Sequence, residues 1–338
     1  MRLLVTGGAG FIGSNFVAHM LRRDDCSVRV LDALTYAGNR ENLTEVSADS
    51  RFEFLQGDVC DREAVEQALA GIDVVVHFAA ESHNDRSIHG PGGAVTTNVM
   101  GTLTLLDASR EADIERFIFI STDEVYGEAL DQPKTENDPL QPRGPYSASK
   151  AGADLMCRAY FVTYGLPVII HRATNNYGPY QYPEKLIPLF CYRALRDESL
   201  PVYGDGMQVR DWLHVSDNCR AIGLLVEHGV PGEAYNVPGD NERPNMDVIR
   251  LMLDELGKPE SLIDFVEDRP GHDVRYSLGG TKIAELGWRA EVPWETGMRS
   301  TFRWFAEHRD WLEASVGRGE DFLKQWYAKR GWNAVTEG

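Results

Sequence analysis

The sequence contains no apolar run that approaches the roughly 20 residues needed to cross a membrane. Basic residues are also scarce, because 34 Lys and Arg face 52 Asp and Glu and leave a formal net charge of -18. This acidity argues against nucleic acid or an anionic membrane as a general partner, since both attract positive charge. It suits a salty habitat, although acidic surfaces also serve solubility alone. An anionic ligand would need a local cluster of basic side chains.

Cysteine is rare and lacks the spacing of a structural site. The five residues are Cys26, Cys60, Cys157, Cys191 and Cys219, and none forms a CxxC pair. An odd count without paired spacing argues against a disulfide framework and a zinc site, so we expect no bound metal. We expect reduced, mostly buried thiols and a cytoplasmic protein. The first residues read as a strand and a turn rather than a secretion signal.

The first half of the chain alternates β-rich runs with helical patterns. The alternation predicts a doubly wound parallel sheet covered on both faces, an α/β fold. The expected strands are 2–6, 27–31, 52–56, 74–78, 117–120 and 167–171, and the expected helices are 11–22, 61–69, 95–110 and 146–164.

After about residue 177 the chain becomes rich in turns, aromatic residues and Arg. We therefore predict a cofactor-binding domain over residues 1–177 that also receives 210–237. A smaller mixed α/β domain over 178–338 would mainly bind the substrate. No low-complexity linker separates them, so the two should pack together.

A glycine-rich turn follows the first strand and opens the first helix. Gly7, Gly10 and Gly13 permit a tight turn with close backbone approach, while Phe11 and Ile12 start the helix that faces a pyrophosphate. This context predicts a dinucleotide site. The alternative is a purely structural turn.

Two carboxylates follow the next strands. Asp32 ends the second strand, where it would accept hydrogen bonds from the adenosine ribose and repel a 2′-phosphate, which favours NAD over NADP. Its alternative role is a capping residue. Asp58 is placed to reach the adenine ring, with a helix N-cap as an equal alternative.

Tyr146 and Lys150 lie one helical turn apart, so both face the same side. The Lys charge would stabilise a phenolate and lower the pKa of Tyr146. Thr122 ends the preceding strand, where open α/β sheets place their ligands, and could bond the same alcohol oxygen. The alternative for Thr122 is a turn residue.

Asp123 and Glu124 are adjacent acids at the same strand end. Adjacent carboxyls are most often solvated or capping, but here they follow Thr122 directly. Such a pair titrates as a coupled unit, so one member can hold a proton near neutral pH. This suits one acid and one base, as loss of water requires.

Basic groups in the second half could bind an anion. Lys185, Arg210, Arg269 and His272 lie in loops rich in Gly, Pro and aromatic residues. Each alone is more often a surface charge, but together they predict a diphosphate site.

Six motifs in order resemble the dTDP-glucose 4,6-dehydratases of the extended short-chain dehydrogenase/reductase superfamily, from Met1 to about residue 310. They are HFAAESHNDRSI at 77–88, STDEVYG at 121–127, PLQPRGPYSASKAGADL at 139–155, NNYGPYQYPEKLIPLF at 175–190, VYGDGMQVRDWLHVSDNCRAI at 202–222 and EDRPGHDVRY at 267–276. The resemblance implies a Rossmann-type fold, tightly held NAD and a nucleotide-sugar substrate in deoxysugar biosynthesis, for instance of rhamnose.

The resemblance also implies a reaction. Tyr146, supported by Lys150 and Thr122, would take the proton of the sugar 4-hydroxyl while hydride passes from C4 to NAD. Glu124 would then remove the C5 proton, and Asp123 would protonate the departing C6 hydroxyl. Hydride return to C6 and reprotonation of C5 would complete dTDP-4-keto-6-deoxyglucose, with no net change in the cofactor.

Further residues are assigned by the resemblance alone. Besides those above, the cofactor would contact Val59, Ala79, Ala80 and Asn176, together with Tyr146 and Lys150. The substrate would contact Ser82, Asp85, Thr122, Asn175, Lys185, Leu186, Val202, Tyr203, Arg210, Asn245, Arg269 and His272. Helices 95–110 and 146–164 would pair two subunits in an isologous homodimer.

The chain departs from the family's pattern at two positions. Asn84 stands where an apolar residue such as Val is expected, and Thr174 stands where Ser is expected. We expect neither to touch the acid and base assignments, although Asn84 leaves local substrate contacts open. Residues from Trp326 to Gly338 match no pattern.

Rivals with the same fold are a UDP-glucose 4,6-dehydratase, separated only by the base pocket, and nucleotide-sugar 4-epimerases and UDP-glucuronate decarboxylases, which lack the acid/base pair. A non-catalytic NAD-binding regulator is the alternative of another class, and the intact reactive residues argue against it.

Overall fold

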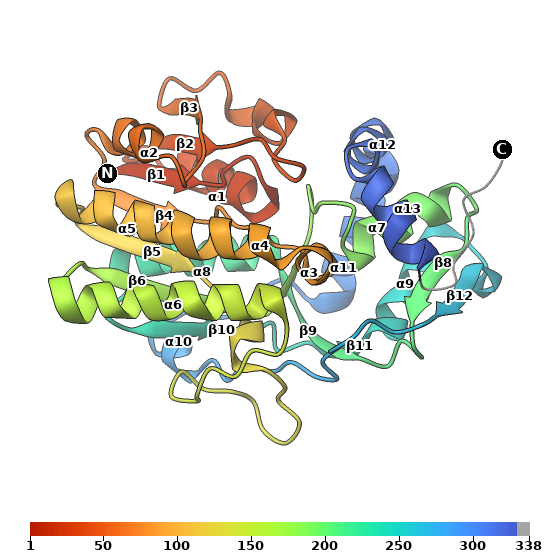
Figure 1. Cartoon of the computed structure of the whole chain (residues 1–338). Helices are drawn as coiled ribbons and strands as arrows, with labels where there is room; N and C mark the ends of the chain where they lie inside the picture. Colours follow the sequence, from red (N-terminus) through yellow and green to blue (C-terminus); the bar gives the residue numbers. More distant parts are fainter. Residues whose placement is uncertain (330–338) are drawn as a thin grey trace.

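A seven-stranded parallel sheet forms the centre of the computed structural model, which describes residues 1–329 (Figure 1). Its strand order is β10-β6-β5-β4-β1-β2-β3, and each neighbouring pair is parallel. The strands are β1 Arg2–Thr6, β2 Ser27–Asp32, β3 Phe52–Gln56, β4 Val74–His77, β5 Arg116–Ile120, β6 Val168–Ala173 and β10 Ala234–Val237. The predicted doubly wound sheet is confirmed.

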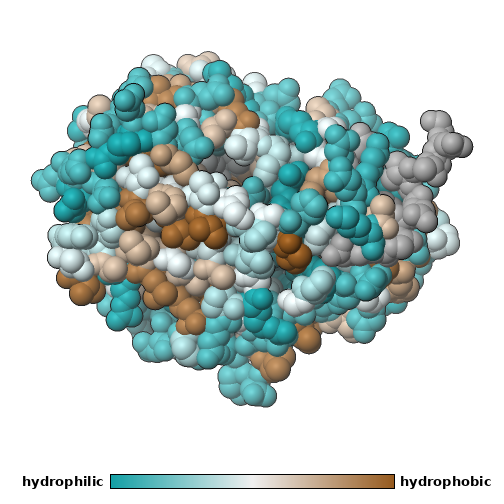
Figure 2. Space-filling model, viewed as in Figure 1, coloured by the Kyte–Doolittle hydropathy of each residue, from teal (hydrophilic) through white to brown (hydrophobic). Residues whose placement is uncertain are grey.

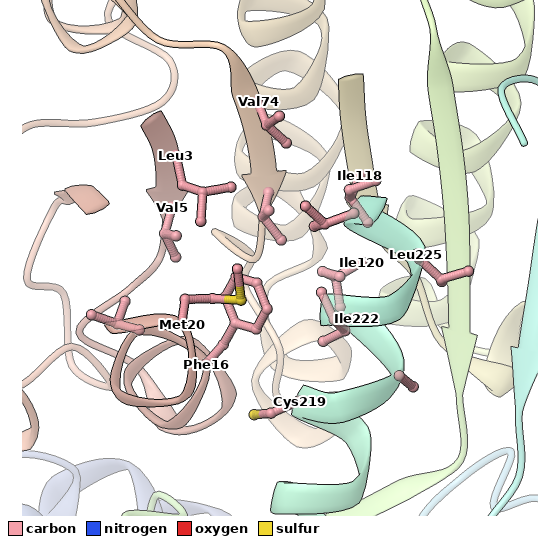
Figure 3. Packing of buried hydrophobic residues seen from close by; sticks show 14 of the residues in the cluster. Leu3, Val5, Phe16, Met20, Val74, Ile118, Ile120, Cys219, Ile222 and Leu225 are labelled. Carbon is pink, nitrogen blue, oxygen red and sulfur yellow. The ribbon is translucent and has the colours of Figure 1, made fainter. Parts of the chain in front are cut away.

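Helices cover both faces of this sheet. One face carries α1 Phe11–Leu21 and α8 Val215–His228, and the other carries α2 Arg62–Leu69, α5 Thr102–Glu111 and α6 Pro145–Tyr164 (Figure 1). Figure 3 shows Phe16 and Met20 of α1 against Val5 and Ile222, all fully buried. Strands that are buried on both faces need the continuous apolar runs seen in the sequence.

The chain leaves the centre of the sheet in two directions. β2 and β3 lie on one side of β1, while β4, β5, β6 and β10 lie on the other. Open α/β sheets bind ligands at this reversal, outside the carboxyl ends of the strands. The loops after β1, β4 and β5 meet there, and they carry the predicted reactive residues.

The second half builds a smaller body beside the sheet (Figure 1). Its strands form two small sheets, β11-β9-β7 and β12-β8. The elements are β7 Asn175–Tyr177, α7 Leu186–Leu195, β8 Leu200–Tyr203, β9 Val209–His214, β11 Glu242–Pro244, α9 Asn245–Leu256, η4 Glu260–Leu262, β12 Ile263–Val266, α11 Trp294–Glu307, α12 Arg309–Gly317 and α13 Glu320–Ala328.

Two later segments return to the main sheet. We expected residues 210–237 to join it, and α8 and β10 of this segment do. β9, which covers its first residues, pairs with β7 and β11 instead. α10, Thr281–Glu285, contacts β10, and Ile283 and Trp288 complete the core beneath α1 and α8.

The predicted helix 95–110 is wrong in its first half. Residues Val95–Gly101 form a π-helix, η2, and only Thr102 onward is α-helical. The side chain of Asn98 is buried there, where it donates to the hydroxyl of Ser149 and the carbonyl of Glu81. A widened turn accommodates such an inward polar side chain, and the sequence periodicity does not reveal it.

Four short helices lie in the connections of the first half. They are η1 Arg40–Val46, α3 Asn84–His89, α4 Pro91–Ala94 and η3 Asp123–Tyr126, and two of them, α3 and η3, contribute residues to the cavities. On the outer surface, hydrophobic residues gather where α5 and α6 run side by side (Figure 2). Through residue 329, no helix combines the length and apolarity of a membrane span, and no group of three His, Cys, Asp or Glu could hold a metal ion. The five cysteines are unpaired, and all but Cys60 are buried.

Candidate active site

The glycine-rich turn packs directly against the loop after β4. Gly7 has a φ of +70°, and a Cβ added to it would lie 2.6 Å from the backbone nitrogen of Ala79. A Cβ on Gly13 would lie 2.3 Å from the carbonyl oxygen of Gly7. Only glycine fits these two positions, so α1 begins close to the sheet edge with its free N–H groups facing the cleft.

Asp32 holds the same turn from the second strand. Its carboxylate accepts from the backbone N–H of Ala9 at 2.9 Å and of Leu34 at 2.8 Å, and burial raises its pKa. Asp58 accepts from the N–H of Cys60, whereas the N-cap of α2 is Asp61. The capping alternative for Asp58 is therefore wrong.

A cavity of about 1590 Å³, open solvent included, runs from the glycine turn to the end of β5. Every residue expected at the cofactor lines it: Gly7, Gly10, Phe11, Ile12, Gly13, Asp32, Asp58, Val59, Ala79, Ala80, Tyr146, Lys150 and Asn176. The side-chain oxygen of Asn176 is buried and has no partner among the described residues. A helix N-terminus, a ribose-facing carboxylate and an unsatisfied amide oxygen fit NAD.

The reactive triplet lies where β5 ends. Thr122 is the N-cap of η3, with its Oγ1 accepting from the N–H of Glu124 at 3.3 Å. The same hydroxyl donates to Oδ1 of Asp123 at 3.1 Å. Thr122 is thus a turn residue as well as a cavity-lining one.

Asp123 and Glu124 occupy unlike surroundings. Asp123 is buried, and its Oδ2 has no hydrogen-bond partner in the part of the chain described. Burial, followed by the charge of Glu124, raises the pKa of Asp123 to about 8. Asp123 therefore holds a proton near neutral pH, as a proton donor must.

Lys150 is buried beneath the cleft. Its Nζ donates to the carbonyl oxygen of Ile120 at 2.6 Å and lies 4.2 Å from the centre of the Phe119 ring. Burial lowers the pKa of Lys150 to about 8. The lysine is therefore fixed at the end of β5, under the nicotinamide end of the predicted cofactor site.

The prediction that Lys150 lowers the pKa of Tyr146 is wrong, because the protein's own groups together raise this pKa. Burial and the charges of Glu124 and Asp123 raise this pKa, while a hydrogen bond with Thr122 opposes the shift. Lys150 donates to backbone instead. The positive charge of an oxidised nicotinamide, if bound beside Tyr146, would also favour the phenolate.

A second cavity, of about 980 Å³ with open solvent included, extends toward the smaller body. Ten expected substrate residues line it: Asp85, Asn175, Lys185, Leu186, Val202, Tyr203, Arg210, Asn245, Arg269 and His272. The other two, Ser82 and Thr122, line the first cavity. Glu124, Asn175, Asn176, Gln181 and Lys185 line both, so the two cavities meet at the reactive carboxyl.

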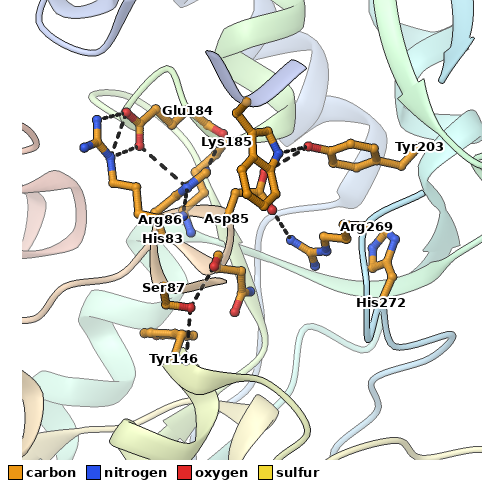
Figure 4. A network of polar contacts seen from close by, with 12 residues as sticks. His83, Asp85, Arg86, Ser87, Tyr146, Glu184, Lys185, Tyr203, Arg269 and His272 are labelled. Carbon is orange, nitrogen blue, oxygen red and sulfur yellow. Dashed lines mark hydrogen bonds and ion pairs between the residues drawn. The ribbon is translucent and has the colours of Figure 1, made fainter. Parts of the chain in front are cut away.

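The basic residues are tied to the wall of this second cavity. Nη1 of Arg269 lies 3.2 Å from Oδ1 of Asp85, and Tyr203 donates to Oδ2 of Asp85 at 2.9 Å (Figure 4). Nζ of Lys185 donates to the carbonyl oxygen of Ser82 at 2.7 Å.

Arg210 and His272 are also anchored. Arg210 donates to the carbonyl oxygens of Val209 and Asp273, and its guanidinium lies 4.5 Å from the centre of the Tyr276 ring. Nδ1 of His272 lies 2.6 Å from Oδ1 of Asp268. Burial lowers the pKa of His272 to about 4, so this ring is neutral at neutral pH and the positive charge comes from the Arg and Lys residues.

Sequence reasoning missed contacts made by Asn84 and by the last described helix, α13. Asn84 donates to both carboxylate oxygens of Glu124, at 3.1 and 3.0 Å, a contact that the sequence did not predict. Trp326 donates from Nε1 to the hydroxyl of Tyr203 at 2.7 Å, and the Tyr327 ring stacks on that of Tyr203. The remaining unmatched residues, 330–338, lie outside the described part.

A clamp around Arg86 was also missed. Its guanidinium lies 3.8 Å from the centre of the Tyr36 ring and 4.4 Å from that of Phe322 in α13. It also bonds the buried carboxylate of Glu184, next to Lys185 (Figure 4). Arg86 thereby joins the segments of Tyr36, Glu184 and Phe322, which are far apart in the sequence.

The chain was compared with known families and proteins. The model of the GDP-mannose 4,6 dehydratase family matches residues 4–301. The chain belongs to this family. The low-salt glycan biosynthesis protein Agl12 of Haloferax volcanii is 54% identical over 89% of this chain and 97% of its own. A dTDP-glucose 4,6-dehydratase of Escherichia coli is 46% identical over 93% and 96%.

Solved structures agree with these relatives. DesIV of Streptomyces venezuelae, a dTDP-glucose 4,6-dehydratase crystallised with NAD and TYD bound, has a TM-score of 0.91 and is 51% identical over 93% of this chain and all of that one. A UDP-glucose 4-epimerase of Thermus thermophilus in complex with NAD has a TM-score of 0.84 and is 33% identical over 91% and 100%. The shared fold extends to the epimerases.

Proposed function

We propose that the protein is a dTDP-glucose 4,6-dehydratase, an NAD-dependent hydro-lyase that forms dTDP-4-keto-6-deoxyglucose and water. The observation that carries the proposal is the adjacent pair of buried Asp123 and half-buried Glu124, which lies with Tyr146 where the cofactor cavity meets the second cavity. Alcohol oxidation alone needs no such pair, whereas elimination of water needs an acid and a base. Relatives and solved neighbours with this activity support the same conclusion.

Each reactive residue would have a separate role in the reaction, set by its position in the site. Tyr146, bonded to Thr122, would take the proton of the 4-hydroxyl, with Lys150 fixed behind it. NAD, when bound, would supply the hydride acceptor for C4 and the hydride donor for C6. A ketone at C4 makes the C5 hydrogen acidic, so the carboxylate of Glu124 would remove that proton. Asp123, which holds its proton to about pH 8, would protonate the oxygen that leaves C6.

The second cavity would bind the nucleotide diphosphate. Lys185, Arg210 and Arg269 carry positive charge into it, and Asn175 has a buried side-chain oxygen without a partner among the described residues. Local basic charge of this kind lets an acidic protein hold an anionic ligand. Residues 1–177, with α8 and β10, would form the NAD-binding domain, and the rest mainly the substrate domain.

We also propose a homodimer in the cytoplasm. Val95 and Met100 of η2 are half exposed, as is Leu155 of the neighbouring α6, and Val162 of α6 is more exposed still. Apolar residues clustered on one face suit an isologous contact between copies of this chain. The five unpaired thiols suit a reducing compartment, where the product would enter deoxysugar synthesis such as that of rhamnose.

The test is incubation of the purified protein with dTDP-glucose and, separately, UDP-glucose, without added NAD. We expect a 4-keto sugar, detected by its alkali-induced absorbance, from dTDP-glucose. Turnover of UDP-glucose alone would reassign the base preference. A 4-epimer without a 4-keto-6-deoxy product would overturn the dehydratase proposal, and no conversion would favour a non-catalytic role.

A further inference from the structure

Among the described residues, Asn84 is the one side chain that hydrogen-bonds the carboxylate of Glu124. Its Nδ2 lies almost equally far from both oxygens, at 3.1 and 3.0 Å. Asn84 is the first residue of α3, and both side chains line the second cavity. One amide nitrogen between two carboxylate oxygens fixes the plane of the carboxylate and favours its charged form.

The segment around Asn84 is rigidly held. The hydroxyl of Ser87 donates to the carbonyl oxygen of Asn84 at 2.7 Å and accepts from the N–H of Tyr146 at 3.1 Å (Figure 4). Ser87 is fully buried. The same turn of α3 therefore fixes the start of α6, which carries Tyr146, and the donor that faces Glu124.

Asp123 has the opposite surroundings. It receives one hydrogen bond, from Thr122, and its other oxygen is buried with no partner among the described residues. Two adjacent carboxyls that share a proton place it on the member with the poorer stabilisation of charge. The two acids are neighbours in sequence, so an asymmetry between them must come from such contacts.

On this geometry, and resting on the proposed function, we infer that Asn84 is a positioning residue that assigns the shared proton. Its amide keeps Glu124 as the carboxylate that takes the C5 proton and so leaves the proton on Asp123, which gives it to the C6 oxygen. The C5–H and C6–O bonds break, and the hydroxyl leaves as water. Asn84 itself bonds neither substrate nor cofactor in this role.

Charged and titratable groups from several elements also face Glu124. They are Asp123 of η3, Tyr146 of α6, Lys185 before α7, Arg210 of β9, and Arg269 and Tyr276, which follow β12. The three cations favour the charged carboxylate as well, so loss of the Asn84 donors should shift the balance without reversing it. We therefore expect a change in pH dependence rather than complete loss of turnover.

The test uses the holoenzyme and the variants Asn84→Val, Asn84→Gln and Asn84→Asp in single turnovers of dTDP-glucose. The rise of bound NADH reports oxidation at C4, and its decay, with solvent deuterium entering C5, reports elimination. In Asn84→Val the rise should stay within about twofold of wild type. The pH below which the decay of NADH slows should rise by about one unit, because the loss of one hydrogen bond to a charged group has an effect of this size.

The other variants separate a lost donor from a disturbed fold. Asn84→Gln keeps the amide and should restore part of the shift, while Asn84→Asp keeps the shape, lacks the donors and should shift this pH at least as far as Val. A Val variant whose decay superimposes on wild type at every pH overturns the inference. So does an equal slowing of rise and decay in all three variants, which would indicate structural damage. Wild-type protein that makes no 4-keto sugar would instead defeat the proposed function.

Discussion

At the scale of single residues, two chemically similar acids differ because of their neighbours. Asp123 has a buried oxygen without a partner among the described residues, whereas both oxygens of Glu124 accept from Asn84. The sequence predicted that the pair would share a proton, but it did not indicate which contacts make the two acids differ. That information lies in a contact between residues 40 positions apart.

Replacement of the proposed base should separate oxidation from elimination. Glu124→Gln keeps the shape of the side chain but cannot take a proton, so turnover should fall by about 10²- to 10⁴-fold while bound NADH accumulates. Absorbance of bound NADH after mixing with dTDP-glucose measures this. Tyr146→Phe is the matched control, since it should abolish the NADH rise itself. Normal turnover of the Glu124 variant would mean that another residue is the base.

The elimination step should fail at alkaline pH. Asp123 gives a proton only while it holds one, so the decay of NADH should slow above about pH 8, where its raised pKa is passed. Single-turnover traces against pH measure this, and the NADH rise reports any separate effect of Lys150 on oxidation. In Asp123→Asn this alkaline limb of the decay should disappear. A limb of unchanged position and depth in that variant would assign it to a different group.

At the scale of elements, sequence patterns located most strands and helices of the first half but not all of their geometry. The strand 52–56 has the predicted bounds, while residues 95–110 divide into a π-helix and an α-helix. Apolar spacing reports which face is buried, and the π-turn depends on the single inward side chain of Asn98. The contribution of α13 was also unpredictable, because Trp326 meets Tyr203 across 123 residues of chain.

The last described helix should affect substrate affinity more than chemistry. Trp326→Phe removes the donor to the Tyr203 hydroxyl, which in turn bonds Asp85 in the cavity wall. We expect KM for dTDP-glucose to rise by about 3- to 10-fold, the value of one hydrogen bond, with kcat unchanged. Steady-state kinetics measure both. Trp311→Phe is the control, because Trp311 bonds Asn42 instead. A fall in kcat at constant KM would contradict this placement.

At the scale of the whole molecule, the architecture follows from the strand and helix alternation, and the comparisons confirm it. The cofactor cavity was predictable because its residues follow consecutive strands that end at one edge of the sheet. In the second cavity, only the four basic residues Lys185, Arg210, Arg269 and His272 were grouped from the sequence itself, and the other lining residues were assigned through the family resemblance. Its residues come from loops whose spacing carries no period, so composition alone could not bring them together.

A single charge should separate the proposed dimer. Val162 of α6 is 71% exposed, and a carboxylate at a self-complementary contact would meet its own copy across the twofold axis. Val162→Glu should therefore convert most of the dimer to monomer, as measured by analytical ultracentrifugation. Phe265→Glu is the control, since Phe265 is 58% exposed and lies in β12 of the smaller body, at the other end of the molecule from α6 (Figure 1). Equal sedimentation of the Val162 variant and the wild type would contradict the proposed interface.

The Arg86 clamp has a consequence for how the protein matures. Tyr36 and Arg86 are synthesised early, but Phe322, the second ring against this guanidinium, follows only after all the strands of the main sheet. The nascent sheet can therefore take shape while one wall of its binding chamber is still missing. A chain that lacks α13 would lose this clamp together with Tyr327, which lines the second cavity, so the chamber is complete only after α13 has been made.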